Sequence, residues 1–260
     1  MIHRPRKRFG QNFLHDPGVI QRIVAAIDPQ PDEHLVEIGP GRGAITRPLL
    51  EKRALLDVIE LDRDLIEPLH ALEVQGARPR VHNADALRFD FRALSSGERL
   101  RIVGNLPYNI STPLIFHLLE QIDVIRDMHF MLQREVVKRI AAQPGTSDWG
   151  RLGIMVQYYC RVTPLFGVAP GAFHPAPRVH SSVVRLIPHA TPPVPLDDPA
   201  RLARITAQAF SRRRKTLRNA LRGLVDEQTL QALGIDPQRR PETLTLTEFA
   251  ALANSIPREG

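Results

Sequence analysis

Apolar and polar positions alternate in blocks along the chain up to about residue 160. Short apolar runs predict buried strands at Leu35–Ile38, Leu55–Leu61, Arg80–Ala84, Arg101–Asn105 and Met128–Leu132. Between these runs, apolar residues recur at helical spacing in Ala44–Arg53, Asp64–Val74 and Thr112–Gln121. Alternating buried strands and helices are typical of a parallel sheet that carries helices on both faces. The pattern therefore predicts an α/β fold.

The pattern changes in the last third of the chain. Two apolar runs, Val162–Val168 and Ser182–Ile187, predict further strands at an antiparallel edge. His189–Pro199 contains four prolines and predicts a semi-rigid linker. Helical patterns follow it at Ala200–Leu224, Glu227–Leu233 and Thr247–Ser255. We therefore expect a sheet domain over residues 1–188 and a small all-α domain over residues 197–260.

The chain is basic, with 35 lysines and arginines against 28 aspartates and glutamates, a net charge of +7. Such a surplus favours polyanionic partners, because neutralising phosphates releases their counterions. The basic residues gather in an N-terminal cluster, Arg4, Arg6, Lys7 and Arg8, and a late cluster, Arg212, Arg213, Arg214, Lys215, Arg218 and Arg222. Two solvated basic faces or a membrane-surface helix would also give these clusters.

A single cysteine, Cys160, excludes a disulfide framework and a multi-cysteine zinc site. The ten histidines form no pairs with acidic residues at metal-ligand spacing, so we expect no metal ion. No apolar run is long enough to span a bilayer, and no apolar segment of a secretory signal follows the basic N-terminus. Together these features favour a cytoplasmic protein that does not bind a membrane.

A glycine-rich segment, Val36–Ala44, joins the first predicted strand to the first predicted helix. Gly39 and Gly41 would let the backbone approach a ligand that a Cβ would block. The spacing departs from the dinucleotide fingerprint, since the third glycine is Gly43 and Ala44 follows it. The segment therefore favours a cofactor without phosphates.

Acidic residues follow the next two predicted strands. Glu60 ends the second strand, about twenty residues beyond the glycines, where a carboxylate can accept hydrogen bonds from both hydroxyls of a ribose. Asp85 follows the third strand and could accept a hydrogen bond from an adenine amino group, although a helix cap would use the same residue. Both positions lie at the carboxyl ends of strands, where open α/β sheets bind ligands.

Asn105-Leu106-Pro107-Tyr108 follows the fourth predicted strand and resembles the signature of amino-methyltransferases that act on nucleobases and glutamine. The lone pair of an aromatic amine is delocalised into its ring, so the amine is a poor nucleophile. Acceptors aimed at its hydrogens free that lone pair, and the Asn105 side chain and the Leu106 main chain can supply them. Pro107 would stiffen the turn, and Tyr108 would stack on the base.

The order of five motifs is similar to that in the ribosomal RNA adenine dimethyltransferase family. The motifs are Phe9–Leu14, Glu37–Gly43, Gly104–Ser111, Phe173–Ser181 and, as in bacterial members, Phe210–Leu221. The resemblance implies a Rossmann-like class I methyltransferase sheet with S-adenosylmethionine as cofactor. It also implies that Asn12 and Leu14 line the cofactor pocket, together with Asn105. Phe173 becomes a second candidate for stacking on the base, with packing in the core as the other interpretation.

The resemblance implies dimethylation of the N6 amino group of adenines in small-subunit ribosomal RNA, with a role in ribosome biogenesis. The partner would be an immature small subunit, bound by a monomer through the basic clusters. A large-subunit adenine methyltransferase of the antibiotic-resistance type shares the fold and the motifs. A non-catalytic assembly factor and a nicotinamide oxidoreductase are further alternatives, although Asn105–Tyr108 has no purpose in the latter.

Overall fold

The structure is a computed structural model that describes residues 11–212 and 214–256. The predicted RNA-binding residues Arg6, Lys7, Arg8 and Arg213 lie outside the described residues. The chain divides into two compact units. The first unit contains the residues up to Val137 together with Thr163–Pro188, and the second contains Lys138–Val162 together with the residues from His189 onward.

The described residues of the chain form a seven-stranded sheet in the order β4-β3-β2-β5-β6-β9-β7. The strands are β2 (His34–Ile38), β3 (Leu55–Glu60), β4 (Arg80–Asn83), β5 (Leu100–Asn105), β6 (Ile125–Gln133), β7 (Cys160–Val168) and β9 (Ser181–Pro188). β2 pairs in parallel with β3 on one side and with β5 on the other. Strand order therefore reverses between β2 and β5, which is where open α/β sheets bind ligands. The predicted α/β fold is confirmed.

The remaining strand pairs complete the sheet. β3 pairs in parallel with β4, and β5 pairs in parallel with β6. β9 runs antiparallel to β6, with Ser181 opposite Gln133. A separate two-stranded sheet joins β1 (Phe13–Leu14) to β8 (Phe173–His174) in antiparallel pairing. Both predicted strands are therefore present, β9 antiparallel to β6 and β7 at the edge of the sheet, and the first and fourth family motifs meet through β1 and β8.

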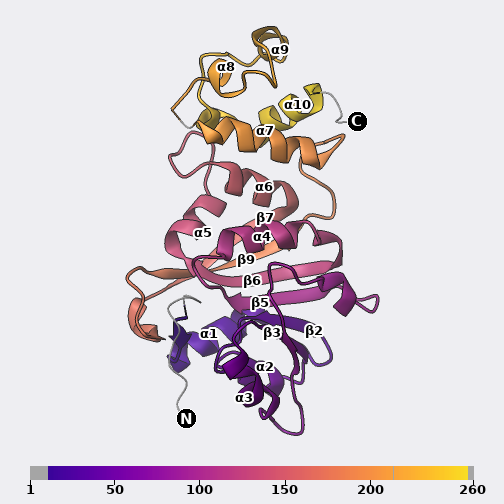
Figure 1. Cartoon of the computed structure of the whole chain (residues 1–260), viewed down its shortest axis with the longest axis vertical. Coiled ribbons are helices and arrows are strands. Elements are labelled where there is room, and N and C mark those ends of the chain that lie inside the picture. Colours follow the sequence, from indigo (N-terminus) through magenta and orange to yellow (C-terminus); the bar gives the residue numbers. More distant parts are fainter. Residues whose placement is uncertain (1–10, 213, 257–260) are drawn as a thin grey trace. The chain divides into compact units, whose positions relative to one another are not determined.

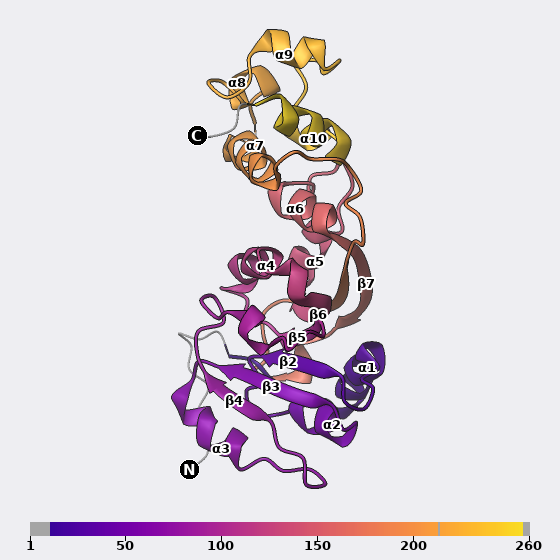
Figure 2. The same cartoon turned by 90° about the vertical axis from the view of Figure 1, so that its right-hand side faces the viewer.

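Helices of the first unit cover the sheet, as Figure 2 shows for α1 and α2 on one side and α4 on the other. They are α1 (Pro17–Ile27), α2 (Thr46–Glu51), α3 (Ile66–His70) and α4 (Ser111–Leu119), and α5 (Arg134–Ile140) runs from this unit into the second. α1 was not predicted. Pro17 begins it, the Asp16 carboxylate caps it by accepting from the Val19 N–H at 2.9 Å, and Ile23 and Ile27 join the core.

The second unit is built from helices, with α7 packed against α6 and α10 (Figure 1). They are α6 (Arg151–Tyr159), α7 (Pro199–Ser211), α8 (Leu217–Ala220), α9 (Glu227–Ala232) and α10 (Leu246–Ser255). The Trp149 indole N–H donates to the Leu244 carbonyl at 2.8 Å and ties the segment before α6 to that before α10. No helix among the described residues is long and apolar enough to cross a membrane.

Two expectations for this region differ from the structure. The single helix predicted over Ala200–Leu224 is wrong, because α7 ends at Ser211 and α8 begins only at Leu217. Arg212, Arg214 and Lys215 are exposed, so the intervening segment has no apolar face to bury. The compact units also divide the chain differently from the predicted domains, since Lys138–Val162 groups with the C-terminal helices. The predicted boundaries of the functional domains stay a prediction.

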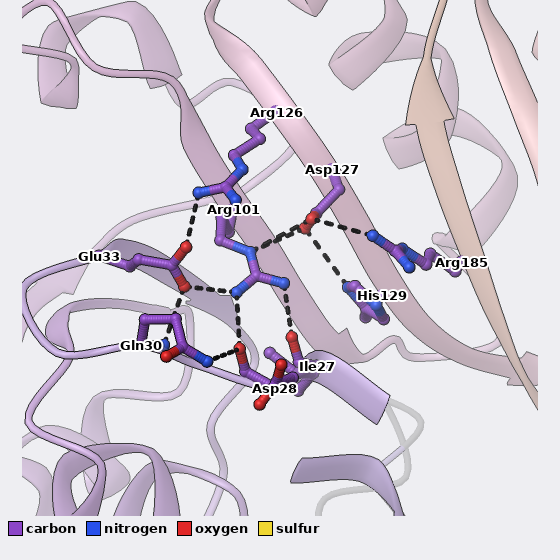
Figure 3. A network of polar contacts seen from close by, with 9 residues as sticks. All are labelled: Ile27, Asp28, Gln30, Glu33, Arg101, Arg126, Asp127, His129 and Arg185. Carbon is purple, nitrogen blue, oxygen red and sulfur yellow. Dashed lines mark hydrogen bonds and ion pairs between the residues drawn. The ribbon is translucent and has the colours of Figure 1, made fainter. Parts of the chain in front are cut away.

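A buried ion-pair network holds the end of α1 against β5 and β6 (Figure 3). Arg101 is 5% exposed and Asp127 is 3% exposed. The Arg101 Nε lies 3.2 Å from both Asp127 carboxylate oxygens, and its Nη1 donates to Glu33 Oε2 at 2.6 Å. Its Nη2 donates to the Ile27 carbonyl at the end of α1. One guanidinium therefore links two strands to α1, the helix that was not predicted.

We expect Arg101→Met to destabilise the protein by about 3–5 kcal/mol, because it removes the guanidinium that is hydrogen-bonded to the buried Asp127 carboxylate and leaves Arg185, at 3.9 Å, as the nearest arginine. Arg126→Met is the matched control. Arg126 also pairs with Glu33, but its side chain is 57% exposed, so its loss should change stability by about 1 kcal/mol or less. Equilibrium unfolding in urea measures both, and equal effects of the two substitutions would contradict the assigned role of Arg101.

Candidate functional site

A cavity of about 330 Å³ opens at the carboxyl ends of the parallel strands in the first unit. Its lining comes from the segment before and within β1, the loop after β2, the end of β3, and the loops after β4 and β5. It brings together ten of the residues predicted from the sequence: Asn12, Leu14, Gly39, Gly41, Glu60, Asp85, Asn105, Leu106, Pro107 and Tyr108.

The glycine loop is closely covered by the N-terminal segment. Gly41 has φ +58°, and a Cβ on it would lie 3.0 Å from Cδ1 of Phe13. The Arg42 guanidinium lies 4.6 Å above the centre of the Phe13 ring. The loop is also tied to the sheet, since the Gly39 N–H donates to the Ile59 carbonyl at 2.9 Å. A side chain at Gly41 would therefore collide with the wall of the cavity as well as strain the turn.

β2 and β5 approach each other closely beside the cavity. A Cβ on Gly104 would lie 2.6 Å from the Ile38 carbonyl oxygen, a distance that no real side chain tolerates. This approach brings Asn105 next to the glycine loop, because a Cβ on Gly39 would lie 3.9 Å from the Asn105 carbonyl oxygen. The candidate reaction motif and the candidate cofactor loop thus share one wall.

Glu60 is a buried carboxyl group, 7% exposed, at the end of β3. Burial raises its pKa, opposed by hydrogen bonds from the main chain. Its Oε2 accepts from the Gly41 N–H at 3.2 Å and its Oε1 accepts from the Asp62 N–H at 2.8 Å. A carboxylate has about four acceptor positions, so these bonds fix its orientation and leave acceptor capacity on each oxygen for a ligand.

Asp85 lines the cavity after β4. Its Oδ1 accepts from the Leu87 N–H at 3.0 Å, so the residue caps the following turn, as one interpretation of the sequence expected. The other oxygen, Oδ2, makes no hydrogen bond to the described residues and remains an acceptor for a ligand. Among the described residues, no group of three or more His, Cys, Asp or Glu side chains is arranged to hold a metal ion.

Asn105 presents a defined face to the cavity. Its Nδ2 donates to the main-chain carbonyl of Asn12 at 3.1 Å. Because the amide nitrogen is engaged there, the side-chain oxygen Oδ1 is the atom left to accept from a ligand amine. The next residue, Leu106, donates its N–H to the Met131 carbonyl of β6 at 3.1 Å, which anchors the motif to the sheet.

Tyr108 is half-buried, and its hydroxyl lies 2.9 Å from Oγ of Ser181, the first residue of β9. Burial raises the pKa of this phenol, so it stays protonated at neutral pH. Its main-chain carbonyl accepts from Oγ of Ser111, at the start of α4, at 3.3 Å. Both ends of the residue are therefore held by neighbouring elements.

Phe173 does not belong to the described lining of the cavity. It is 3% exposed, pairs with Leu14 through β1 and β8, and belongs to the hydrophobic core cluster. This conformation leaves almost no ring surface for a base to contact, which favours the core interpretation. A stacking role for Phe173 remains a prediction.

Two further groups at the cavity were not singled out from the sequence. Glu37 lines it from β2, is 2% exposed, and accepts from Oγ1 of Thr46 at 2.6 Å. Burial raises the pKa of the Glu37 carboxyl to about 7, opposed by the Thr46 bond and helped by the nearby Glu60. Gln11 donates from Nε2 to Oδ2 of Asp62 at 2.8 Å and holds the N-terminal segment near β3. The sequence held a signal that could have identified Glu37, because it is an acidic residue inside an apolar strand.

The late basic cluster lies in the second unit. Its described members are all exposed: Arg212, Arg214, Lys215, Arg218 and Arg222. Arg218 lies 3.6 Å from the Glu227 carboxylate, and Arg222 donates to the Asn219 side chain at 3.1 Å. These side chains are accessible to a polyanion, as the predicted RNA-binding role requires.

Comparison with known proteins points to one family. The family described as ribosomal RNA adenine dimethylase matches residues 2–257. A relative from Pseudomonas aeruginosa, named Ribosomal RNA small subunit methyltransferase A, is 59% identical over 255 residues, which cover 98% of this chain and 95% of the relative. A relative of the same name from Methylococcus capsulatus is 55% identical over 259 residues, covering 98% and 99%.

Two solved structures resemble the fold over nearly its whole length. A dimethyladenosine transferase from Plasmodium falciparum has a TM-score of 0.76 and 26% identity, covering 92% of this chain and 95% of its own. The 23S rRNA methyltransferase ErmE has a TM-score of 0.70 and 25% identity, covering 93% and 98%. Both resemblances extend beyond the first unit, because the coverage exceeds its length.

The Glu37 carboxyl makes stability depend on pH. Between the ordinary pKa of 4.5 and the folded pKa of about 7, the folded state keeps a proton that the unfolded state has lost, so stability falls as pH rises. Glu37→Gln removes this penalty and keeps an acceptor for Thr46. In the absence of ligands, we expect it to stabilise the protein by about 3 kcal/mol at pH 8 and by little at pH 5.

Urea unfolding at the two pH values checks this expectation. Glu51→Gln is the matched control, because Glu51 is an exposed acid at the end of α2 and its loss should matter little at either pH. A stabilisation by Glu37→Gln that is the same at pH 5 and pH 8 would show that Glu37 does not titrate in this range.

Proposed function

The chain belongs to the ribosomal RNA adenine dimethylase family, and on this premise we propose that it transfers two methyl groups to the N6 amino group of adenines in small-subunit ribosomal RNA. The observation that carries the proposal is the fixed carboxamide of Asn105, whose bond to the Asn12 carbonyl leaves Oδ1 as an acceptor within the cavity. The cofactor would be S-adenosylmethionine, which supplies an electrophilic methyl group when bound.

The cavity residues fit this cofactor. Glu60 has acceptor capacity on both oxygens for the two hydroxyls of a ribose, and its orientation is fixed by the Gly41 and Asp62 N–H groups. Asp85 offers Oδ2 to an adenine amino group. Gly41 has no Cβ where Phe13 approaches the loop, which lets Phe13 lie against the loop at the wall of the cavity. Leu14 and Gly39 complete this wall.

Asn105 and Leu106 would accept hydrogen bonds from the target amine through Oδ1 and the main-chain carbonyl. These acceptors favour a pyramidal nitrogen, so its lone pair becomes available for attack. No strong base is required, because the nitrogen becomes acidic once it has gained a methyl group. Pro107 restricts the turn, and Tyr108 provides an aromatic face on which an adenine that has left its helix can stack.

The small-subunit substrate is favoured over the large-subunit one by the degree of similarity. The relatives named for the small subunit are 55–59% identical to this chain, against 25% for the 23S rRNA methyltransferase ErmE. The exposed arginines and lysine of the second unit would contact phosphates of an immature small subunit. We further propose that the protein acts in the cytoplasm as a monomer.

Glu60→Ala should weaken the binding of S-adenosylmethionine by about 1.5–3 kcal/mol, because it removes charge-assisted hydrogen bonds to the ribose. Isothermal titration calorimetry measures the affinity. Glu51→Ala, an exposed acid on α2, serves as the control. Unchanged affinity of the Glu60→Ala protein would remove Glu60 from the cofactor site.

The proposed activity predicts a defined product. After prolonged reaction of the purified protein with immature small subunits, mass spectrometry of RNA nucleosides should detect dimethyladenosine, with monomethyladenosine as a transient. Asn105→Ala should suppress both steps by about 100-fold or more, in line with the loss of one preorganised donor or acceptor in other active sites, while cofactor binding persists. Monomethyladenosine as the only final product would contradict dimethylation, and full activity of Asn105→Ala would contradict the role of Asn105.

A further inference from the structure

Ser181 contacts Tyr108 of the Asn105–Tyr108 motif from β9, a strand that runs antiparallel to β6. Ser181 is fully buried, and its Oγ lies 2.9 Å from the Tyr108 hydroxyl. It begins β9, which runs antiparallel to β6, so the start of β9 lies at the edge where β6 ends. The Arg134 N–H donates to the His180 carbonyl at 2.9 Å and fixes the residue before Ser181. The hydroxyl is therefore held in place by the sheet.

We propose that Ser181 is a positioning residue for methyl transfer, whose hydroxyl fixes the place of the Tyr108 ring on which the target adenine stacks. The inference rests on the proposed function and deepens it. Stacking energy depends on how far the two rings overlap, so a tyrosine ring that swings freely would hold the base in several positions. A base that is misaligned with the Asn105 oxygen reacts slowly, because transfer requires a defined approach.

The outer end of the Tyr108 ring is restrained by the hydrogen bond between its hydroxyl and Ser181. The main chain of Tyr108 is anchored through Ser111 Oγ, and the preceding Leu106 is anchored on β6. These bonds set the path of the backbone, whereas the bond from the Tyr108 hydroxyl to Ser181 restrains the first side-chain torsion, which swings the ring. This bond joins the fourth family motif to the third across the sheet.

This assignment changes what the Phe173–Ser181 motif contributes. Its first residue, Phe173, is packed in the core, so the aromatic ring predicted to stack is not exposed to the cavity. Its last residue, Ser181, instead acts on the stacking ring of Tyr108. The motif thus extends from the core, at Phe173, to the reaction site, where Ser181 contacts Tyr108.

The chain offers a matched control in the next residue. Ser182 is 8% exposed, and its Oγ donates to the Phe166 carbonyl at 3.1 Å. Because side chains alternate along a strand, Ser182 points to the other face of the sheet from Ser181. Ser182→Ala therefore removes a buried serine hydroxyl and one hydrogen bond from β9 without touching Tyr108.

A double-mutant cycle tests the proposal, with Ser181→Ala, Tyr108→Phe, the double variant and Ser182→Ala. Single-turnover methyl transfer to immature small subunits gives the rate at saturating substrate, and calorimetry gives the affinity for S-adenosylmethionine. We expect each substitution in the Ser181–Tyr108 pair to lower the rate about three- to tenfold, the effect of one lost hydrogen bond. The double variant should be no slower than the slower single variant. All four variants should bind S-adenosylmethionine as tightly as the unmodified protein does. Ser182→Ala should also transfer methyl groups at the rate of the unmodified protein.

Additive effects of Ser181→Ala and Tyr108→Phe would overturn the proposal, as would an equal loss in Ser182→Ala or a parallel loss of cofactor affinity. If Ser181→Ala fails to fold, Tyr108→Phe still removes the same bond and keeps the ring. A full rate of methyl transfer in Tyr108→Phe is then sufficient to overturn the proposal. Absence of methyl transfer by the unmodified protein would instead contradict the proposed function.

Discussion

The close approach of β2 and β5 at Gly104 is the constraint on which the candidate site depends. The Ile38 carbonyl occupies the space that a side chain at position 104 would need. Because the two strands meet there without a side chain between them, the loop that leaves β2 and the motif that leaves β5 begin side by side. Strand order reverses between these two strands, so no helix crosses the gap and the cavity forms above it.

The remaining features of the site follow from the direction of the strands. Parallel strands deliver their carboxyl ends to one edge, which is why Glu60, Asp85 and Asn105 converge although they are far apart in the sequence. An antiparallel strand delivers its first residue to the same edge. β9 thus contributes to the site at the residue where it begins, and the network around Arg101 secures the opposite part of the sheet, near the amino ends of β5 and β6.

The sequence predicted those parts of the molecule that depend on local pattern. The strands of the parallel sheet were predicted because buried strands are continuous apolar runs, and Glu60 and Asp85 followed from the rule that ligands bind at strand ends. α1 was not predicted although its apolar residues recur at helical spacing, at Val19, Ile20, Ile23, Val24 and Ile27, so its signal was present in the sequence. The break after Ser211 was missed because arginine and lysine are good helix formers, although the exposed Arg212, Arg214 and Lys215 offer no apolar side chain to pack.

The contact partners of a side chain depend on tertiary structure, so they could not be predicted from the sequence. Nothing in the pattern around Phe173 distinguishes a stacking ring from a core ring, and nothing around Ser181 indicates that a tyrosine 73 residues earlier lies within hydrogen-bonding distance. Glu37 is the intermediate case. An acid within a buried strand signals a special environment, but the Thr46 donor and the neighbouring Glu60 that define it come from other elements.

The bond between Asn105 and Asn12 has a consequence for how such a site can change during evolution. The acceptor is a main-chain carbonyl, which every amino acid carries, so no single replacement at position 12 deletes it. Selection on this contact therefore acts on the route of the N-terminal segment, which Gln11 and Phe13 hold in place through Asp62 and Arg42. Grafting the Asn105–Tyr108 loop into another scaffold would transfer its residues without the oriented carboxamide, unless the crossing segment were transferred with it.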